Sequence, residues 1–178
     1  MKSQDSEEIL DVINVHDEVI GIASRGEIHA KSLFHRAVHI FVFDEAGNIY
    51  VQRRNDQKDS HPSKLDSSAA GHVDSGEDYF EAARRELLEE LSLLDQIKEE
   101  LRFGPDEKTD NERVVLYSCV AAAQPQPNPL EIASGRFWKP LDLEKEMAQR
   151  ADDFVPAFLV LWRLFKKKEN ESSNTESN

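Results

Sequence analysis

Apolar residues along the chain fall into short extended runs and a few helical repeats, which together predict a mixed α/β architecture. The segment 36–43, Arg-Ala-Val-His-Ile-Phe-Val-Phe, is apolar on both faces of an extended chain and is typical of a strand in the middle of a sheet. Because strands are expected both in hairpins and between helices, we predict a mixed sheet with helices on both faces. The other expected strands lie at 9–15, 19–23, 49–53, 114–122 and 134–138, and the expected helices at 78–91, 141–150 and 156–166.

The clearest helix is the segment 78–91. Ser75 and Asp78 have the spacing of a capping box, which would start the helix at this point. One face of the helix carries apolar residues at helical spacing, and we expect it to pack on the sheet. These residues are Phe80, Ala83, Leu87 and Leu91.

Composition restricts the classes of function. A chain of 178 residues has the length of about one domain. Its formal net charge of −13 argues against broad binding to nucleic acid or to anionic membranes. The single cysteine, Cys119, favours a reducing, cytoplasmic setting, and we expect neither a signal peptide nor a membrane span. An acidic protein can still act on phosphate-containing small molecules if metal cations bridge its carboxylates to the substrate.

Carboxylates suited to that task are grouped on the helix at 78–91. Glu86 and Glu90 lie roughly 40° apart on a helical wheel, and Glu89 lies roughly 60° to the other side of Glu86. Two like charges ~6 Å apart repel by roughly 3 kcal/mol at an effective dielectric constant of 20. Arg85 can pair with Glu89 and relieve part of this repulsion. A divalent cation would relieve more of it, and a small cluster of carboxylate oxygens suits Mg²⁺.

The same segment resembles the signature of the Nudix hydrolase family. The family pattern is Gly, five residues, Glu, seven residues, Arg-Glu, an aliphatic residue, any residue, Glu-Glu, any residue, Gly and an aliphatic residue. The matching residues are Gly71, Glu77, Arg85, Glu86, Leu87, Glu89, Glu90 and Leu93. Ser92 replaces the last glycine, and we expect it to strain a left-handed helix end without removing a metal ligand. An ordinary solvated helix face is the weaker interpretation.

The resemblance implies a Nudix-type α/β/α sandwich with a mixed β-sheet, in which the motif forms a loop, a helix and a loop at the metal site. It extends over 9–165 and is similar to the branch related to isopentenyl-diphosphate isomerase. The landmarks of that branch are Asp17-Glu-Val-Ile-Gly, His35-Arg-Ala-Val-His, Gln52-Arg-Arg and Asp66-Ser-Ser-Ala-Ala-Gly-His72-Val. We expect a Nudix domain at 9–168, between a flexible N-terminus at 1–8 and a disordered polar tail at 169–178.

The resemblance also implies a reaction and a cofactor. The reaction is hydrolysis of a diphosphate linkage in a small molecule of the nucleoside-diphosphate type, with Mg²⁺, which Mn²⁺ can replace. Glu86 and Glu90 are implied as the principal metal ligands, and Glu89 as a further ligand or a base. The backbone carbonyl of Gly71 is implied as an additional ligand. The general base stays open between Glu89, Glu90 and Glu131.

Residues around the motif are expected to bind substrate or to brace the site. Arg53, Arg54 and His72 are candidates for substrate binding, with ordinary surface charge as the alternative for the two arginines. Arg85 and Glu77 are expected to hold the loop against the helix. The substrate itself stays open, because specificity depends on loops outside the motif. The oligomeric state stays open as well, with a homodimer as the commonest assembly.

Two other functions are weighed against hydrolysis. An isomerase of the related branch would use a cysteine where this chain has Ala70, and Cys119 is expected to be a buried core residue. A non-catalytic Nudix sensor is the third interpretation, and it is disfavoured because the three glutamates of the motif are present.

Several residues also lie at positions that resemble those at which the isomerase binds a metal. They are His35, His72, Asp110 and Glu112. His29 fits less well, because it is one residue out of spacing from His35. These residues form either a second metal site or a set of structural hydrogen bonds.

Overall fold

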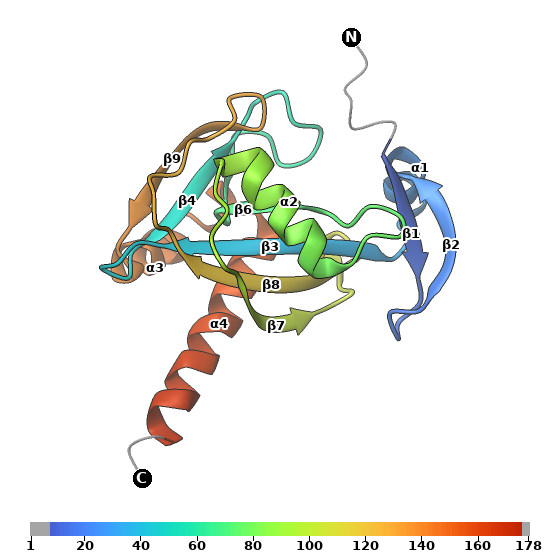
Figure 1. Cartoon of the computed structure of the whole chain (residues 1–178). Coiled ribbons are helices and arrows are strands. Elements are labelled where there is room, and N and C mark those ends of the chain that lie inside the picture. The colour runs from blue at the N-terminus through green and yellow to red at the C-terminus, as the bar shows by residue number, and fades with distance from the viewer. Residues whose placement is uncertain (1–7, 176–178) are drawn as a thin grey trace.

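A seven-stranded mixed sheet lies at the centre of the molecule (Figure 1). The structure is a computed structural model that describes residues 8–175, with side chains described up to residue 173. The strands are β3 (His35–Phe43), β4 (Ile49–Arg54), β5 (Leu65–Asp66), β6 (Ala69–His72), β7 (Lys98–Phe103), β8 (Glu112–Val120) and β9 (Ile132–Trp138). Their order is β5-β4-β3-β8-β7, with β6 paired to β3 and β9 paired to β4. β3 and β8 run parallel, and the other pairs are antiparallel.

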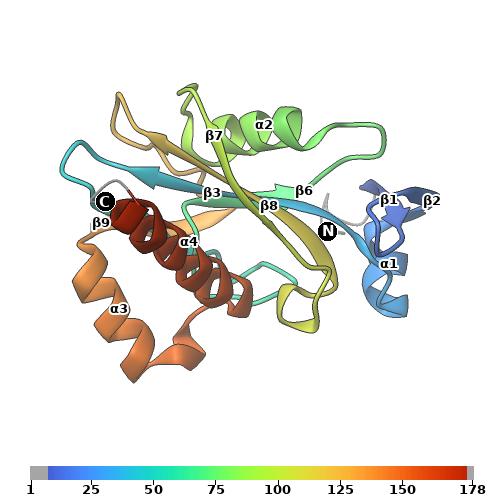
Figure 2. The ribbon, with the colours of Figure 1, turned by 90° about the horizontal axis from the view of Figure 1, so that it is seen from below.

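The central strand β3 is buried on both faces, as its sequence predicts. Because alternate residues of a strand point to opposite faces, Ala37 and Phe41 enter one core, whereas Val38, Ile40 and Val42 enter the other. Helix α2 (Tyr79–Leu91) covers the second core, and α3 (Pro140–Gln149) and α4 (Pro156–Thr175) lie on the opposite face of the sheet (Figure 2). The expected α/β/α sandwich is therefore confirmed.

Helix α2 begins one residue later than expected, and its capping residue differs from the prediction. The side chain of Asp78 accepts a hydrogen bond from the backbone N of Glu81 at 2.8 Å, and the Glu81 side chain accepts one from the backbone N of Asp78. The capping box is thus formed by Asp78 and Glu81. Ser75 lies outside it, since its Oγ donates to Asp11 at 2.7 Å.

The buried face of α2 agrees with the prediction except at one position. Ala83, Leu87 and Leu91 are buried against the sheet. Phe80 is 46% exposed, although its ring contacts Tyr117 in a T-shaped arrangement. Tyr79 occupies the buried side of the first helical turn instead, so the expectation for Phe80 was wrong.

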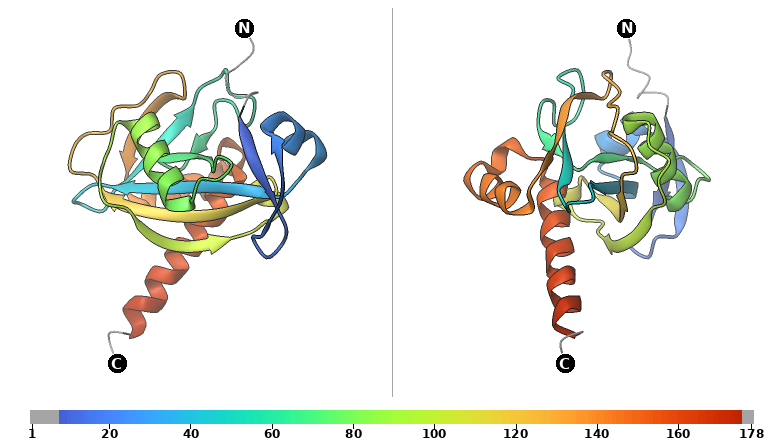
Figure 3. Two further views of the ribbon diagram at one scale, coloured as in Figure 1. Left: turned by 45° about the vertical axis from the view of Figure 1, so that its right-hand side comes forward. Right: turned by 60° about the vertical axis from the view of Figure 1, so that its left-hand side comes forward.

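Helix α4 is longer than the sequence predicts. Its first half packs Phe158, Trp162 and Phe165 against Phe41 of β3. Its second half extends away from the sheet (Figure 3). The predicted disordered tail at 169–178 is corrected, because the helix continues to Thr175, and residues 176–178 lie outside the described part. Local contacts hold the polar turns, such as a hydrogen bond from Ser172 Oγ to the Lys168 carbonyl and an ion pair between Lys166 and Glu169.

The N-terminal part forms a separate two-stranded sheet beside one end of the main sheet (Figure 1). It consists of β1 (Ile9–Ile13) and β2 (Val19–Ser24), which the sequence predicts, and is followed by α1 (Arg25–Lys31), which it does not. The predicted flexible segment 1–8 falls outside the described residues except for Glu8, whose carboxylate is 3.3 Å from His72 Nδ1. None of the described helices has the length and apolar character needed to cross a membrane.

Candidate active site

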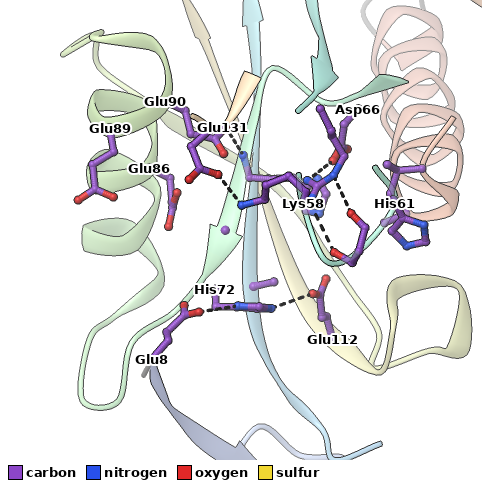
Figure 4. Close-up of a pocket in the computed structure, with 18 of the residues that line it drawn as sticks. Glu8, Lys58, His61, Asp66, His72, Glu86, Glu89, Glu90, Glu112 and Glu131 are labelled. Atoms are coloured by element: carbon purple, nitrogen blue, oxygen red, sulfur yellow. Dashed lines mark hydrogen bonds and ion pairs between the residues drawn. The ribbon is translucent and has the colours of Figure 1, made fainter. Parts of the chain in front are cut away.

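A polar cavity of about 580 Å³ lies beside α2, with walls from β6 and from the loops at 55–64 and 121–131 (Figure 4). Glu86, Glu89 and Glu90 of α2 all line this cavity, as their spacing on the helix predicts. Their exposure differs. Glu90 is 5% exposed, and the side chains of Glu86 and Glu89 are 12% and 57% exposed. The helix thus buries two carboxylates and leaves the third accessible.

Glu90 is fixed by two hydrogen-bond donors. The Nε2 atom of Gln52, on β4, donates to Glu90 Oε2 at 2.9 Å, and the backbone N of Ala70 donates to the same oxygen at 3.3 Å. Gln52 is only 1% exposed and also donates to the Ser68 carbonyl. Because the buried Gln52 amide donates to both the Ser68 carbonyl and Glu90, it holds the Glu90 carboxylate in one orientation.

Gly71 allows the carboxylate of Glu86 to lie directly over the backbone of β6. A Cβ atom at this position would overlap the carboxyl group of Glu86. Only a residue without a side chain permits such a close approach. The backbone of Gly71 and the Glu86 carboxylate are therefore held together at the cavity wall.

Arg85 braces the loop and the helix, as expected. Its guanidinium donates to both carboxylate oxygens of Glu77, at 3.0 and 2.9 Å, and to the carbonyl of His72 at 3.0 Å. It also donates to Glu86 at 2.5 Å and lies 3.5 Å from Glu89. The Arg85 guanidinium thus links Glu77, in the loop before the helix, to Glu86 and Glu89 on the helix.

The electrostatics of the buried acids favour a cation. Burial raises the pKa of Glu86 to about 7, although the charge of Arg85 acts in the opposite direction. Burial also raises the pKa of Glu90 well above its usual range, and the neighbouring charge of Glu86 adds to this effect. Two desolvated carboxylates that repel one another bind protons more tightly, and a divalent cation would favour their ionised forms.

The expected substrate-binding residues do not all face this cavity. Arg53 was wrongly placed, because alternate residues of β4 point to opposite faces and its side chain bonds the Ser63 carbonyl outside the cavity. Arg54 does line the cavity, but its guanidinium is engaged by Asp66 at 3.2 Å and by the Ser60 carbonyl. His72 lines the cavity as well.

The isomerase interpretation is not supported, because the cavity has no thiol at the position where the isomerase needs one for proton transfer. Ala70, at the position of the isomerase cysteine, lines the cavity with a methyl group. Cys119 is buried in the core beneath α2, and burial raises the pKa of its thiol to about 12. A buried thiol of this kind is unreactive, which confirms the sequence-based expectation for Cys119.

Sequence reasoning missed two groups that shape the cavity. Gln52 could have been noticed as a polar residue inside the apolar strand segment Ile-Tyr-Val-Gln. Lys58 had no such signal, since it lies in a polar loop. Its Nζ is 2.5 Å from a carboxylate oxygen of Glu131, which brings the two loops together across the cavity (Figure 4).

Comparison with known proteins agrees with this arrangement. Residues 33–158 match the family model described as the NUDIX domain. A Nudix hydrolase of Yersinia pestis is 38% identical over 165 residues, which cover 92% of this chain and 88% of that protein. The Nudix hydrolase YfcD of Escherichia coli K12 is 35% identical over 175 residues, which cover 97% of this chain and 95% of that protein.

Solved structures show the same fold. The crystal structure of the DR0079 protein from Deinococcus radiodurans matches with a TM-score of 0.72 at 32% identity, covering 80% of this chain and 90% of that one. A MutT protein from Methanosarcina mazei matches with a TM-score of 0.59 at 17% identity, covering 75% of this chain and 93% of that one. The family model covers most of the chain, and relatives at 35–38% identity align along nearly all of it. Together with the acidic helix packed against its glycine loop, these matches show that the chain belongs to the Nudix hydrolases, a family of enzymes that cleave diphosphate linkages.

Proposed function

We propose that this enzyme is a Mg²⁺-dependent hydrolase of a small molecule in which a nucleoside diphosphate is joined to another group. The observation that carries the proposal is the pair of buried carboxylates, Glu86 and Glu90, held at one cavity wall by Arg85, Gln52 and the backbone of β6. Arg85 can offset only one of these two negative charges, whereas a divalent cation would offset both.

The donor set fits a hard divalent cation. Glu86, Glu90, Glu89 and the carbonyl of Gly71 offer only oxygen atoms, which Mg²⁺ and Mn²⁺ prefer. When bound, such an ion would neutralise the diphosphate and lower the pKa of a coordinated water. The chain contributes a preformed cradle, since Arg85 fixes Glu86 and Gln52 fixes Glu90 before any ligand arrives.

We assign the general base to Glu89. Its carboxylate is the most exposed of the three, and its contact with Arg85 is long, at 3.5 Å. It is therefore free to take a proton from the attacking water as the bond to the leaving phosphate breaks. Glu131 is a weaker candidate because Lys58 neutralises its charge. A Glu89→Gln variant should consequently lose more turnover than a Glu131→Gln variant.

The proposal includes the setting in which the enzyme works. The buried, unreactive Cys119 and the net charge of −13 support action on a small molecule in a reducing cytoplasm.

Hydrolysis of the diphosphate linkage yields a nucleoside monophosphate and a second phosphomonoester. Chromatographic detection of these products from a panel of nucleoside diphosphate derivatives, with isopentenyl diphosphate included, tests this function with and without Mg²⁺. We expect Mg²⁺-dependent cleavage of at least one derivative. The Glu90→Gln variant should lose about a hundredfold or more of that rate, while the surface variant Glu45→Gln should keep it. Circular dichroism would check that both variants fold. Full activity in a folded Glu90→Gln variant, or turnover of isopentenyl diphosphate alone, would overturn the proposal.

A further inference from the structure

A buried histidine forms part of the floor of the cavity. His39 lies on β3, is 4% exposed and lines the same cavity as the glutamates of α2. Because residues two apart on a strand point to the same face, His39 lies beside Ala37, which also lines the cavity. Val155 and Ala157, at the start of α4, add two further small side chains to the wall. His39 is thus a polar group among apolar neighbours at this end of the cavity.

A chain of hydrogen bonds fixes the protonation of the His39 ring. Ser67 Oγ donates to Asp66 Oδ1 at 3.3 Å, and His39 Nδ1 lies 2.6 Å from the same hydroxyl oxygen. A serine hydroxyl carries one hydrogen, so the hydroxyl that donates to Asp66 must accept from the ring. Nδ1 therefore carries the proton of the neutral imidazole, and Nε2 carries a lone pair. Arg54 holds the other oxygen of Asp66 at 3.2 Å, so an ion pair anchors the chain.

The Nε2 atom of His39 has no partner within the residues that the structure describes. Nε2 of His35 is also unpartnered, but it is sealed from solvent, whereas Nε2 of His39 keeps an accessible surface where the residue lines the cavity. Buried polar groups in native proteins nearly always have a partner. An acceptor that is left open toward a cavity on an otherwise buried side chain therefore points to a ligand that supplies a donor.

The other two imidazoles that line the cavity are engaged by carboxylates. His72 has a carboxylate oxygen beside each ring nitrogen, at 3.3 and 3.4 Å. His61 Nε2 is 3.0 Å from Asp110 Oδ2. The expected grouping of Asp110 with His35 and His72 was therefore wrong, because Asp110 pairs with His61 instead. His39 differs from both rings, since its second nitrogen faces no carboxylate.

The lone pair on Nε2 restricts the chemistry of its partner. The diphosphate of a nucleoside-diphosphate derivative is ionised and offers only acceptors, so it cannot bond to this atom, whereas a hydroxyl group can. The Asp66 end of the chain also lies across the cavity from Glu86 and Glu89 (Figure 4). No Phe, Tyr or Trp, on which proteins commonly stack nucleobases, occurs among the described residues that line the cavity. The cavity therefore suits a hydroxyl-bearing group better than a nucleobase.

We propose that His39 is a specificity-determining residue, whose Nε2 atom accepts a hydrogen bond from a hydroxyl of a sugar joined to the diphosphate. This assignment rests on the proposed function and deepens it by naming the group that occupies the cavity. A substrate without such a hydroxyl would leave a buried acceptor unpaired and would bind more weakly. The competing explanation is that His39 only fixes Ser67 against β3. That role needs Nδ1 and not Nε2, so variants that separate the two nitrogens distinguish the explanations.

Two substitutions separate the ring nitrogens. In His39→Asn the side-chain amide can still donate to Ser67 but has no atom at the position of Nε2. In His39→Gln the longer side chain can place its amide oxygen near that position and restore an acceptor. The matched control is His16→Asn, which alters an exposed histidine in the turn between β1 and β2. Circular dichroism would check that all three variants fold.

Calorimetric titrations with Mg²⁺ and probes that resist cleavage test the proposal. The sugar probes are the α,β-methylene analogues of ADP-ribose and UDP-glucose, and the probe without a hydroxyl is P,P′-dimethyl methylenediphosphonate, which has the same bridge and charge. We expect the wild type to bind at least one sugar probe and His39→Asn to bind it at least about tenfold more weakly. His39→Gln and His16→Asn should stay within about threefold of the wild type. The probe without a hydroxyl should bind equally to all four proteins.

The outcomes separate this inference from the proposed function. Unchanged binding of the sugar probe to His39→Asn, or equal weakening of both kinds of probe, would give His39 a structural role and overturn the inference. Wild-type protein that binds the dimethyl probe but neither sugar probe would also overturn it, while the diphosphate site would stand. If none of the probes binds in the presence of Mg²⁺, the inference and the proposed function both fail.

Discussion

Single residues decide which carboxylates of α2 can act. Glu86 and Glu90 are buried and held by Arg85 and Gln52, whereas Glu89 is more than half exposed. The three side chains differ in burial because they lie at different angles from the apolar stripe of the same helix. This difference in burial underlies our proposal that Glu86 and Glu90 bind the metal while Glu89 acts as the base.

A methyl group at Gly71 would displace the carboxylate of Glu86, one of the two proposed ligands. The Cβ atom of Gly71→Ala would overlap the carboxyl end of Glu86, which is flexible enough to move aside. We expect the variant to fold and to lose at least about tenfold in Mg²⁺-dependent turnover, because the displaced carboxylate no longer faces the metal. Gly26→Ala is the control, since a Cβ there meets nothing within 4 Å. Steady-state kinetics of both variants decide the point, and unchanged turnover in Gly71→Ala would contradict the role of this glycine.

At the scale of elements, the end of α2 is where the sequence departs from the family pattern. Ser92 has φ 56° and ψ 35°, the left-handed conformation that the sequence predicts for the missing glycine. Its backbone N donates to the carbonyl of Leu88 at 2.9 Å, which completes the last turn. The helix therefore ends in the family manner, at the cost of a strained serine.

Replacing Ser92 with glycine should relieve that strain. We expect Ser92→Gly to raise the free energy of unfolding by about 1 kcal/mol. Ser92→Ala should change it little, because alanine is strained in the same way. Urea unfolding of the wild type and the two variants measures the difference. A destabilised Ser92→Gly variant would contradict the prediction and would show that the serine side chain makes a stabilising contact.

A second link between elements joins α4 to β7. Lys168 Nζ is 2.7 Å from Glu100 Oε2, and Ser118 Oγ donates to Glu100 Oε1 at 2.7 Å. Burial would raise the pKa of Glu100, but the hydrogen bonds from Lys168 and Ser118 outweigh it and lower the pKa below its usual 4.5. The folded pKa is thus below the unfolded one, so this contribution to stability is complete above pH 4.5 and is lost as the pH falls through the folded value.

A Glu100→Gln variant should therefore be less stable only where the wild-type carboxylate is ionised. We expect a loss of about 1–2 kcal/mol at neutral pH, since hydrogen bonds to a buried charge disappear, and no difference at low pH. Glu99→Gln is the matched control on the same strand, where the Glu99–Arg102 pair is nearly half exposed and should contribute little. Denaturant unfolding at several pH values provides the measurement. A difference that is constant with pH would contradict the assignment.

On the scale of the whole molecule, the sequence predicts elements with strong periodicity and misses those that depend on their neighbours. β3 and α2 are predicted nearly to their ends, because each carries its burial pattern in its own residues. β7, Lys-Glu-Glu-Leu-Arg-Phe, is too charged to predict alone and becomes a strand only by pairing with β8. Helix α1, seven residues long, has too few turns to show a period.

The residues of the candidate site likewise fall into those that the sequence predicts and those that it does not. The three glutamates lie on one helix, so their common position could be predicted from spacing. The partners of Gln52 and Lys58 could not be predicted, because each side chain reaches its partner only through contacts between distant segments. Arg53 was placed wrongly because its neighbour Arg54, and not Arg53, points to the cavity side of β4.

The most direct measurement of the central claim is the structure of the protein crystallised with Mn²⁺, whose anomalous scattering locates the ion. We predict Mn²⁺ inside the cavity beside α2, bound by Glu86 and Glu90 near the backbone of Gly71. An ion bound elsewhere, with Glu86 and Glu90 turned toward bulk solvent and no metal between them, would contradict the account.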